Sequence, residues 1–381
     1  MTSSVTPLSN TLPIDEDLAE QGRSGHGIAS QDSRPAAQIP LESQDGKHES
    51  KPALVGGGAV AGAAMGASIG VVTGPVGALV GGMLGAVAGA LGVAAATGTT
   101  VNPKEASSAD AASADVVRLH IEDSGGGGRP GVLIHGWPLS VQAWELQVSA
   151  LQAAGYRVVA YDRRGFGRSD KPESAYSYDT LADDLQRVMD QCGLQDATLV
   201  GFSMGGGEVA RYIARCGETR LHSLVFAAAV PPYLLKTPSN PEGPLTPEKA
   251  QQMKKALEQD RGSFFDQFAT DFFSANGVLQ VTEAQRGDVV ALCHQSAQHA
   301  ALACMEAFGS TDFREDLKHI KLPTLVIHGD ADAIVPAEGS GQRTHRAVAH
   351  SQLMMLNGAP HGMNVSHAQA FNDALLAFLR A

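Results

Sequence analysis

The chain has 381 residues, of which 43% are hydrophobic, so it exceeds one typical domain and can bury a full core. Its formal net charge of −12 at pH 7 disfavours attraction to nucleic acid or to an anionic membrane surface. The four cysteines show no C-x-x-C spacing and no basic-then-apolar leader opens the chain, so we expect no disulfide framework, zinc site or signal peptide, but a cytoplasmic protein.

Two segments of biased composition come first. Residues 1–51 are rich in Ser, Gln, Gly, Pro and acidic residues without periodicity, which predicts a disordered tail. Residues 52–103 contain no charged residue, and nine of their glycines recur every four positions: Gly58, Gly62, Gly66, Gly70 and Gly74, then Gly77, Gly81, Gly85 and Gly89. This spacing lays glycines along one helix face and lets another backbone approach closely.

The break at Gly74-Pro75 divides residues 52–103 into two legs. Each leg of about 20 residues is long enough to cross a hydrocarbon layer of roughly 30 Å. We therefore expect a Gly-zipper helical hairpin that either inserts into a membrane, making the protein membrane-associated, or joins subunits into a homo-oligomer. A disordered Gly/Ala linker is the alternative interpretation.

Residues 115–381 alternate apolar runs with helical patterns, which is typical of an α/β fold with a mostly parallel, doubly wound sheet. A first strand is expected over Val116–Ile121. A helix is expected over Tyr178–Cys192, with Asp179 as its N-cap and Gly193 as its stop. Buried strands are predicted at Val132–Ile134, Val158–Tyr161, Leu199–Phe202, Leu224–Ala228 and Leu325–His328, and a further short strand at Leu353–Leu356.

A polar turn, His135-Gly136-Trp137-Pro138, follows the first buried strand. Its backbone can present the N–H of Trp137 to a developing negative charge. Pro138 has no N–H to donate, but its carbonyl and fixed φ can shape a pocket. We interpret His135 as a residue that stabilises the turn rather than as a catalyst.

The pentapeptide Gly201-Phe202-Ser203-Met204-Gly205 stands between a predicted strand and a predicted helix. A strand, a sharp turn carrying Ser and then a helix is the context of the nucleophile elbow, in which the Ser hydroxyl attacks substrate. The N–H of Met204, the residue after the nucleophile, would be the second donor of an oxyanion hole together with that of Trp137.

A long insertion, residues 231–310, separates two of the predicted strands. Its Pro-rich start leads into a helical pattern at Pro247–Gln259, and this is the place for a cap that lines a pocket. Five phenylalanines recur there at spacings of one, three and four, at Phe264, Phe265, Phe268, Phe272 and Phe273. We favour helix packing over a direct substrate wall as their role.

A Ser nucleophile requires a His base and a carboxylate that holds the tautomer of that base, and on this fold they follow in the order Ser, acid, His. The turn His328-Gly329-Asp330-Ala331-Asp332 offers two candidate acids, Asp330 and Asp332. His361 then lies on a loop just beyond the last predicted strand, where an imidazole can reach both Ser and acid.

Together these motifs closely resemble the α/β-hydrolase superfamily, and within it the cofactor-free bacterial haloperoxidase (non-haem chloroperoxidase) and arylesterase group. The matching segments are His135-Gly136-Trp137-Pro138, Tyr161-Asp162-Arg163-Arg164-Gly165-Phe166-Gly167-Arg168-Ser169-Asp170, Gly201-Phe202-Ser203-Met204-Gly205-Gly206-Gly207, Thr311-Asp312-Phe313-Arg314, His328-Gly329-Asp330-Ala331-Asp332 and Ala359-Pro360-His361-Gly362. The resemblance covers roughly seven tenths of the chain, and residues 52–103 have no counterpart in the group's usual plan.

The resemblance implies that the second Asp of the turn, Asp332, is the acid of a Ser203–His361–Asp332 triad. It also implies ester hydrolysis through an acyl-enzyme, and perhydrolysis in which hydrogen peroxide releases a peracid that oxidises halide. No cofactor, metal or haem is needed for this chemistry. A Pro after the oxyanion-hole Trp, here Pro138, is associated in this group with better perhydrolysis.

The sequence therefore predicts a carboxylic ester hydrolase and perhydrolase that acts on a small-molecule ester or acid. The alternative is a non-catalytic scaffold, in which the zipper is the function and the hydrolase-like domain is a passenger.

Overall fold

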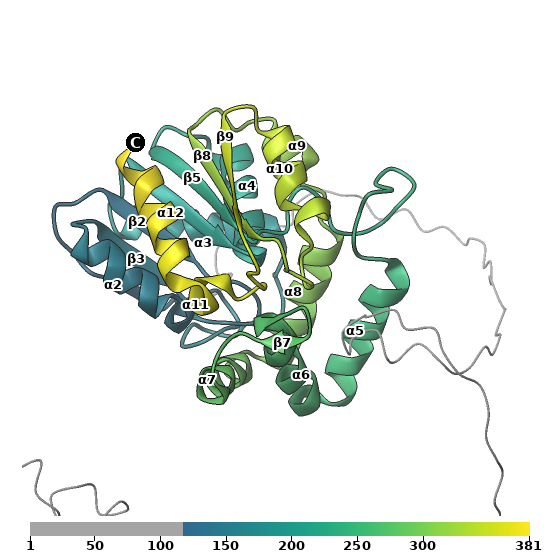
Figure 1. Cartoon of the computed structure of the whole chain (residues 1–381). Coiled ribbons are helices and arrows are strands. Elements are labelled where there is room, and N and C mark those ends of the chain that lie inside the picture. The colour runs from purple at the N-terminus through teal and green to yellow at the C-terminus, as the bar shows by residue number, and fades with distance from the viewer. Residues whose placement is uncertain (1–116) are drawn as a thin grey trace, which may run out of the picture. The chain divides into compact units, whose positions relative to one another are not determined.

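A seven-stranded sheet organises the part of the chain that this computed structural model describes, residues 117–381 (Figure 1). The strand order is β1-β3-β2-β4-β5-β8-β9; β1 is antiparallel to β3, and the remaining neighbours are parallel. The strands are Ile121–Asp123 (β1), Pro130–Ile134 (β2), Arg157–Tyr161 (β3), Ala197–Phe202 (β4), Leu221–Ala227 (β5), Thr324–Gly329 (β8) and Ser351–Leu356 (β9). The predicted mostly parallel sheet is confirmed.

The central strands form the core because both of their faces are covered. Every residue of β4 and β8 is buried, and the side chains of Leu133, Val200 and Phe226 are at most 1% exposed. A fully buried side chain of this kind contributes about 1.5–3 kcal/mol through the hydrophobic effect. Continuous apolar runs rather than alternating ones are expected for such doubly covered strands.

Helices cover both faces of the sheet. In Figure 1, α2 and α12 lie in front of the strands and contact each other, whereas α3 and α4 pair behind them. The helices are Glu145–Ala153 (α2), Tyr178–Gln191 (α3), Met204–Cys216 (α4), Pro247–Gln259 (α5), Arg261–Phe273 (α6), Glu283–His294 (α7), Gln298–Ser310 (α8), Arg314–Leu317 (α9), Gly341–Ala347 (α10), Met363–Ser366 (α11) and Ala368–Arg380 (α12). Within residues 117–381, no helix combines the length and apolar character needed to cross a membrane.

Between β5 and β8 the chain forms helices α5 to α8 and a small two-stranded sheet, β6 (Ser274–Ala275) and β7 (Val278–Leu279), and α9 then leads into β8. Figure 1 shows α5 to α8 and the small sheet gathered beyond one end of the main sheet. Helix α5 has the predicted bounds, because Thr246 caps it and Pro247 occupies its first position.

The first strand is displaced from its predicted position. A strand was expected over Val116–Ile121, but β1 begins only at Ile121. Before it, the His120 N–H donates to the Ser169 hydroxyl at 2.8 Å, so a side chain takes the place of a ladder partner. The stretch that could add an earlier strand lies outside the described residues, as do the predicted tail (residues 1–51) and zipper hairpin (residues 52–103).

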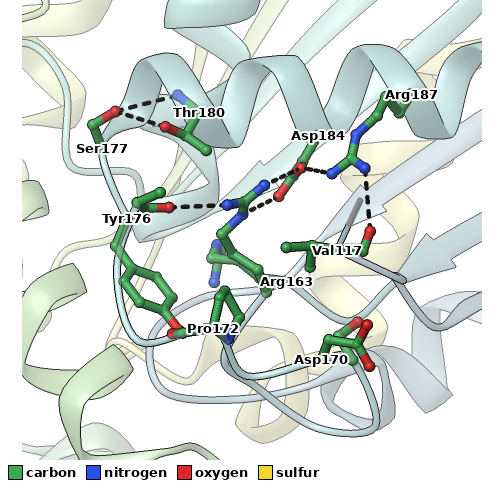
Figure 2. A network of polar contacts seen from close by, with 12 residues as sticks. Val117, Arg163, Asp170, Pro172, Tyr176, Ser177, Thr180, Asp184 and Arg187 are labelled. Carbon is green, nitrogen blue, oxygen red and sulfur yellow. Dashed lines mark hydrogen bonds and ion pairs between the residues drawn. The ribbon is translucent and has the colours of Figure 1, made fainter. Parts of the chain in front are cut away.

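The predicted N-cap of α3 is also wrong. Ser177 caps the helix, because its hydroxyl accepts a hydrogen bond from the Thr180 N–H at 3.3 Å (Figure 2). Asp179 lies in the first turn instead and pairs with Arg211. The predicted stop is confirmed, since Gly193 takes a left-handed φ of 59° directly after the C-cap residue.

Candidate active site

Ser203 occupies the sharp turn between β4 and α4. Its backbone is left-handed, with φ of 54° and ψ of −118°, a conformation that costs a non-glycine residue of order 1–3 kcal/mol. The surrounding backbone holds it there: the Ser203 N–H donates to the Ala227 carbonyl at 2.8 Å, and the Ser203 carbonyl accepts from the Val230 N–H at 3.2 Å. Hydrogen bonds to the end of the neighbouring strand therefore hold this strained turn in place.

Close backbone approach explains the glycines on either side of Ser203. A Cβ on Gly201 would lie 2.6 Å from the carbonyl oxygen of Gly205. A Cβ on Gly205 would lie 2.5 Å from the carbonyl oxygen of Ile134 in the adjacent strand. Any side chain at either position would push α4 away from the sheet, so the pentapeptide needs both glycines.

Three of the predicted site residues meet in one chain of hydrogen bonds. His361 Nε2 lies 2.9 Å from Ser203 Oγ, and His361 Nδ1 lies 2.7 Å from Asp332 Oδ2. All three residues are buried, with exposures of 6% for Ser203, 6% for Asp332 and 1% for His361. They follow β4, β8 and β9, so the parallel sheet delivers them to the same edge.

The carboxylate of Asp332 is held on both oxygens. Oδ1 accepts hydrogen bonds from the N–H groups of Ile334 at 2.9 Å and Val335 at 2.8 Å, which leaves Oδ2 for His361. Burial raises the pKa of this carboxyl, but the charge of His361 and the donated hydrogen bonds outweigh burial, so its pKa lies below the ordinary value of 3.8. Asp332 is therefore ionised at neutral pH.

The other candidate acid, Asp330, has a different environment. It is exposed, and its Oδ1 accepts a hydrogen bond from the Gly358 N–H at 2.6 Å. Asp330 therefore supports the loop that leads to His361 rather than contacting the imidazole itself.

Sequence reasoning missed a second imidazole beside Asp332. His328 is fully buried, with Nε2 2.8 Å from the Val335 carbonyl and 3.3 Å from Asp332 Oδ2. Its Nδ1 has no hydrogen-bond partner within residues 117–381. Nε2 therefore carries the proton and donates, while Nδ1 is the bare nitrogen. The sequence did contain a signal for this contact. An acid four residues after a His at a strand end, as Asp332 follows His328, can fold back to contact that His.

The turn after β2 is fixed by His135. Its Nδ1–H donates to the Gly136 carbonyl at 2.8 Å, and its Nε2 accepts from the Arg163 N–H at 3.0 Å. Burial, reinforced by the charge of Arg163, lowers the pKa of His135 well below 6.5, so the ring is neutral. These contacts agree with the interpretation of His135 as a turn-stabilising residue.

The two predicted oxyanion donors are both available. Among the described residues, neither the Trp137 N–H nor the Met204 N–H donates a hydrogen bond to the protein. Both residues are buried, and Gly136, which precedes Trp137, has no room for a side chain, since a Cβ there would lie 2.7 Å from the Phe202 ring. Pro138, which follows Trp137, is buried as well.

The cap reaches the site through aromatic side chains. The Trp137 indole donates from Nε1 to the Ala301 carbonyl at 2.9 Å, which ties the turn after β2 to α8. Four rings surround the indole at centroid distances of 5.4–6.2 Å, namely Phe264, Phe265, Phe268 and Phe308. The phenylalanines of α6 thus pack as a core, and what they pack against is the turn that presents Trp137.

Helix α6 also contacts the loop of His361. The Phe272 ring stands edge-on to the imidazole of His361 at 5.4 Å. The Phe272 carbonyl accepts a hydrogen bond from the Gly362 N–H at 2.7 Å. A Cβ on Gly362 would lie 2.4 Å from the Phe272 ring, so the cap and the loop meet without space between them.

Comparison with known proteins adds family information to this geometry. The sequence pattern of the alpha/beta hydrolase fold family matches residues 132–368. The chain is 40% identical over 268 residues to a non-heme chloroperoxidase of Kitasatospora aureofaciens, covering 70% of this chain and 97% of that protein. It is 38% identical over 273 residues to a bifunctional esterase/perhydrolase of Acinetobacter calcoaceticus, covering 70% and 98%. A crystal structure of bromoperoxidase from Bacillus anthracis aligns with a TM-score of 0.68 at 48% identity, covering 70% and 96%.

Proposed function

Because the chain belongs to the α/β-hydrolase family and, within it, to the non-heme haloperoxidase group, we propose that it hydrolyses carboxylic esters through an acyl-enzyme on Ser203. We propose further that hydrogen peroxide can replace water in the second half of the reaction. The observation that supports this most is the buried chain of hydrogen bonds from Ser203 through His361 to Asp332, at 2.9 and 2.7 Å.

In the acylation step, Ser203 Oγ attacks the ester carbonyl carbon while His361 Nε2 takes the hydroxyl proton. The tetrahedral oxygen gains negative charge, and the N–H groups of Trp137 and Met204 would bind it. The C–O bond to the alcohol then breaks, and the imidazolium returns its proton to the leaving alcohol. Asp332 keeps the proton of the neutral imidazole on Nδ1, so Nε2 is ready to accept.

In the deacylation step, His361 Nε2 takes a proton from the incoming water or peroxide, whose oxygen attacks the acyl carbon. The bond to Ser203 Oγ breaks, and Oγ recovers the proton from the imidazolium. Water gives a carboxylic acid, and hydrogen peroxide gives a peracid. The peracid then oxidises a halide ion in solution, yielding carboxylate and hypohalous acid, and no metal enters this balance.

Pro138 supports the peroxide branch of the proposal. It is buried directly after Trp137, and its ring nitrogen has no proton to donate. Its carbonyl would accept a hydrogen bond from peroxide entering the acyl-enzyme, which would help peroxide to compete with water.

The test is a series of p-nitrophenyl esters of increasing acyl length, assayed with and without hydrogen peroxide and bromide. We expect ester hydrolysis throughout, and bromination of a reporter dye only when peroxide, bromide and an acyl donor are all present. Bromination without any acyl donor or carboxylic acid would contradict the acyl-enzyme route. The scaffold alternative draws no support from the relatives, which are named as enzymes, and its zipper lies outside the described residues.

A further inference from the structure

Two buried charges lie beside the site and take no part in the chemistry above. Arg163 follows β3, Glu208 lies in α4, and their side chains are 1% and 0% exposed. Arg163 Nε donates to Glu208 Oε1 at 2.5 Å, and the Tyr161 hydroxyl donates to Glu208 Oε2 at 2.7 Å. Every oxygen of this carboxylate is therefore partnered inside the core.

Arg163 also forms hydrogen bonds with the turn that presents Trp137. Its Nη2 donates to the His135 carbonyl at 2.6 Å, and its backbone N–H donates to His135 Nε2 at 3.0 Å. Two residues beyond His135 comes the free N–H of Trp137. The backbone N–H and the guanidinium of Arg163 thus both hold His135, which lies in the turn that carries one oxyanion donor.

Glu208 lies on the helix whose first residue, Met204, carries the other donor. It lies four residues after Met204, which is one turn farther along the same face of α4. A path of hydrogen bonds therefore runs from Glu208, on the helix that begins at one donor, through Arg163 to His135, two residues before the other donor. It crosses three neighbouring strands, because β2 lies between β3 and β4 in the sheet.

The geometry points to Arg163 and Glu208 as positioning residues that set the separation of the two oxyanion donors, an inference that rests on the proposed function. A buried ion pair is poor evidence for stability, since removing two charges from water costs nearly what their attraction returns. The ion pair can affect the rate even if it adds little stability. A preorganised N–H stabilises the transition state only when it points to the position where the oxyanion forms.

The neighbouring residue provides a matched control. Arg164 donates from Nε and Nη2 to Asp184 at 2.5 and 2.7 Å, with side-chain exposures of 8% and 2%. Figure 2 shows Asp184 on α3, where it also contacts Arg187, whose guanidinium donates to the Val117 carbonyl at 3.1 Å. This second ion pair is nearly as buried, but it holds α3 and the start of the described chain and makes no contact with the turn that presents Trp137.

The experiment compares Glu208→Gln with Asp184→Asn in the full chain, with wild type and Ser203→Ala alongside. Steady-state hydrolysis of p-nitrophenyl acetate gives kcat and KM, inhibition by a trifluoromethyl ketone reports oxyanion binding, and thermal unfolding reports stability. For Glu208→Gln we expect kcat to fall on the order of 10²-fold, the loss that a displacement of about 1 Å can cause. KM should change little, and ketone affinity should weaken in parallel with kcat.

Asp184→Asn should lower the unfolding temperature without lowering kcat. The inference is overturned if Glu208→Gln keeps wild-type kcat, if it raises KM alone, or if Asp184→Asn loses kcat equally. Should Glu208→Gln not fold, Arg163→Lys and Tyr161→Phe test the same path, and wild-type kcat in both would overturn it. If wild type shows no Ser203-dependent turnover, the proposed function fails first and this inference fails with it.

Discussion

Replacing Asp332 with Asn tests the acid of the site with almost no change of shape. The two backbone donors at Oδ1, from Ile334 and Val335, require an acceptor, so the Asn carbonyl oxygen must take that position. The Asn amide NH₂ then faces Nδ1 of His361, where the carboxylate oxygen stood at 2.7 Å. A donor there forces the imidazole proton onto Nε2.

That change of tautomer removes the base. With its proton on Nε2, His361 can no longer accept the proton of Ser203, although Nε2 and Oγ remain about 2.9 Å apart. A comparable substitution in a serine protease triad lowers kcat about 10⁴-fold, which corresponds to roughly 5 kcal/mol of activation free energy. Asp330→Asn is the matched control, because its amide oxygen can still accept from the Gly358 N–H. As an exposed substitution it should change the rate by no more than about twofold.

The assay is kcat/KM for p-nitrophenyl acetate in both variants, with folding checked by circular dichroism. A proton NMR spectrum adds a direct observation, since the Nδ1 proton signal of His361 should disappear in Asp332→Asn and persist in Asp330→Asn. If Asp330→Asn proved the crippling change, the assignment of Asp332 would be wrong. If Asp332→Asn lost the Nδ1 proton but kept its rate, the tautomer argument itself would fail.

Four further outcomes are expected. Ser203→Ala should lose both ester hydrolysis and peroxide-dependent bromination by on the order of 10⁴–10⁶-fold, and bromination that survives would reveal a separate oxidative site. Pro138→Leu should lower the ratio of perhydrolysis to hydrolysis while ester hydrolysis persists; an unchanged ratio would exclude a role for Pro138. Because the fold lowers the pKa of Asp332, the stability it contributes is present above its ordinary value of 3.8 and lost as the pH falls toward the lower folded value. The difference between wild type and Asp332→Asn in urea unfolding should therefore be full above about pH 5 and should narrow steadily as the pH falls below 3.8. Deleting residues 1–104 should leave an active hydrolase with fewer subunits by light scattering, and an unchanged subunit count would favour a linker.

Much of the fold could be predicted because it depends on local patterns. Apolar runs of strand length correspond to β2, β4 and β8, since strands covered on both faces have no polar alternation. The bounds of α5 were correct because Pro247 signals a helix start from the sequence itself. The start of β1 could not be predicted, because the Ser169 hydroxyl that bonds to His120 lies far away in the chain.

The site divides in the same way. The order of motifs along the chain predicted that Ser203 and His361 lie together with Asp330 or Asp332, and the family resemblance selected Asp332. The sequence could not predict which carboxylate pairs with Arg163 and which with Arg164, because the two residues are adjacent and identical in type. Only the packing of α3 and α4 behind the sheet directs one to Glu208 and the other to Asp184.

The hydrogen bond between the Gly362 N–H and the Phe272 carbonyl joins the cap directly to the loop that carries His361. Displacing α6 outward would break this bond and withdraw the Phe272 ring from His361. The loop that carries the imidazole would lose this restraint but keep its contacts with the turn of Asp330 and Asp332. The cap therefore restrains the base of the site as well as packing beside it.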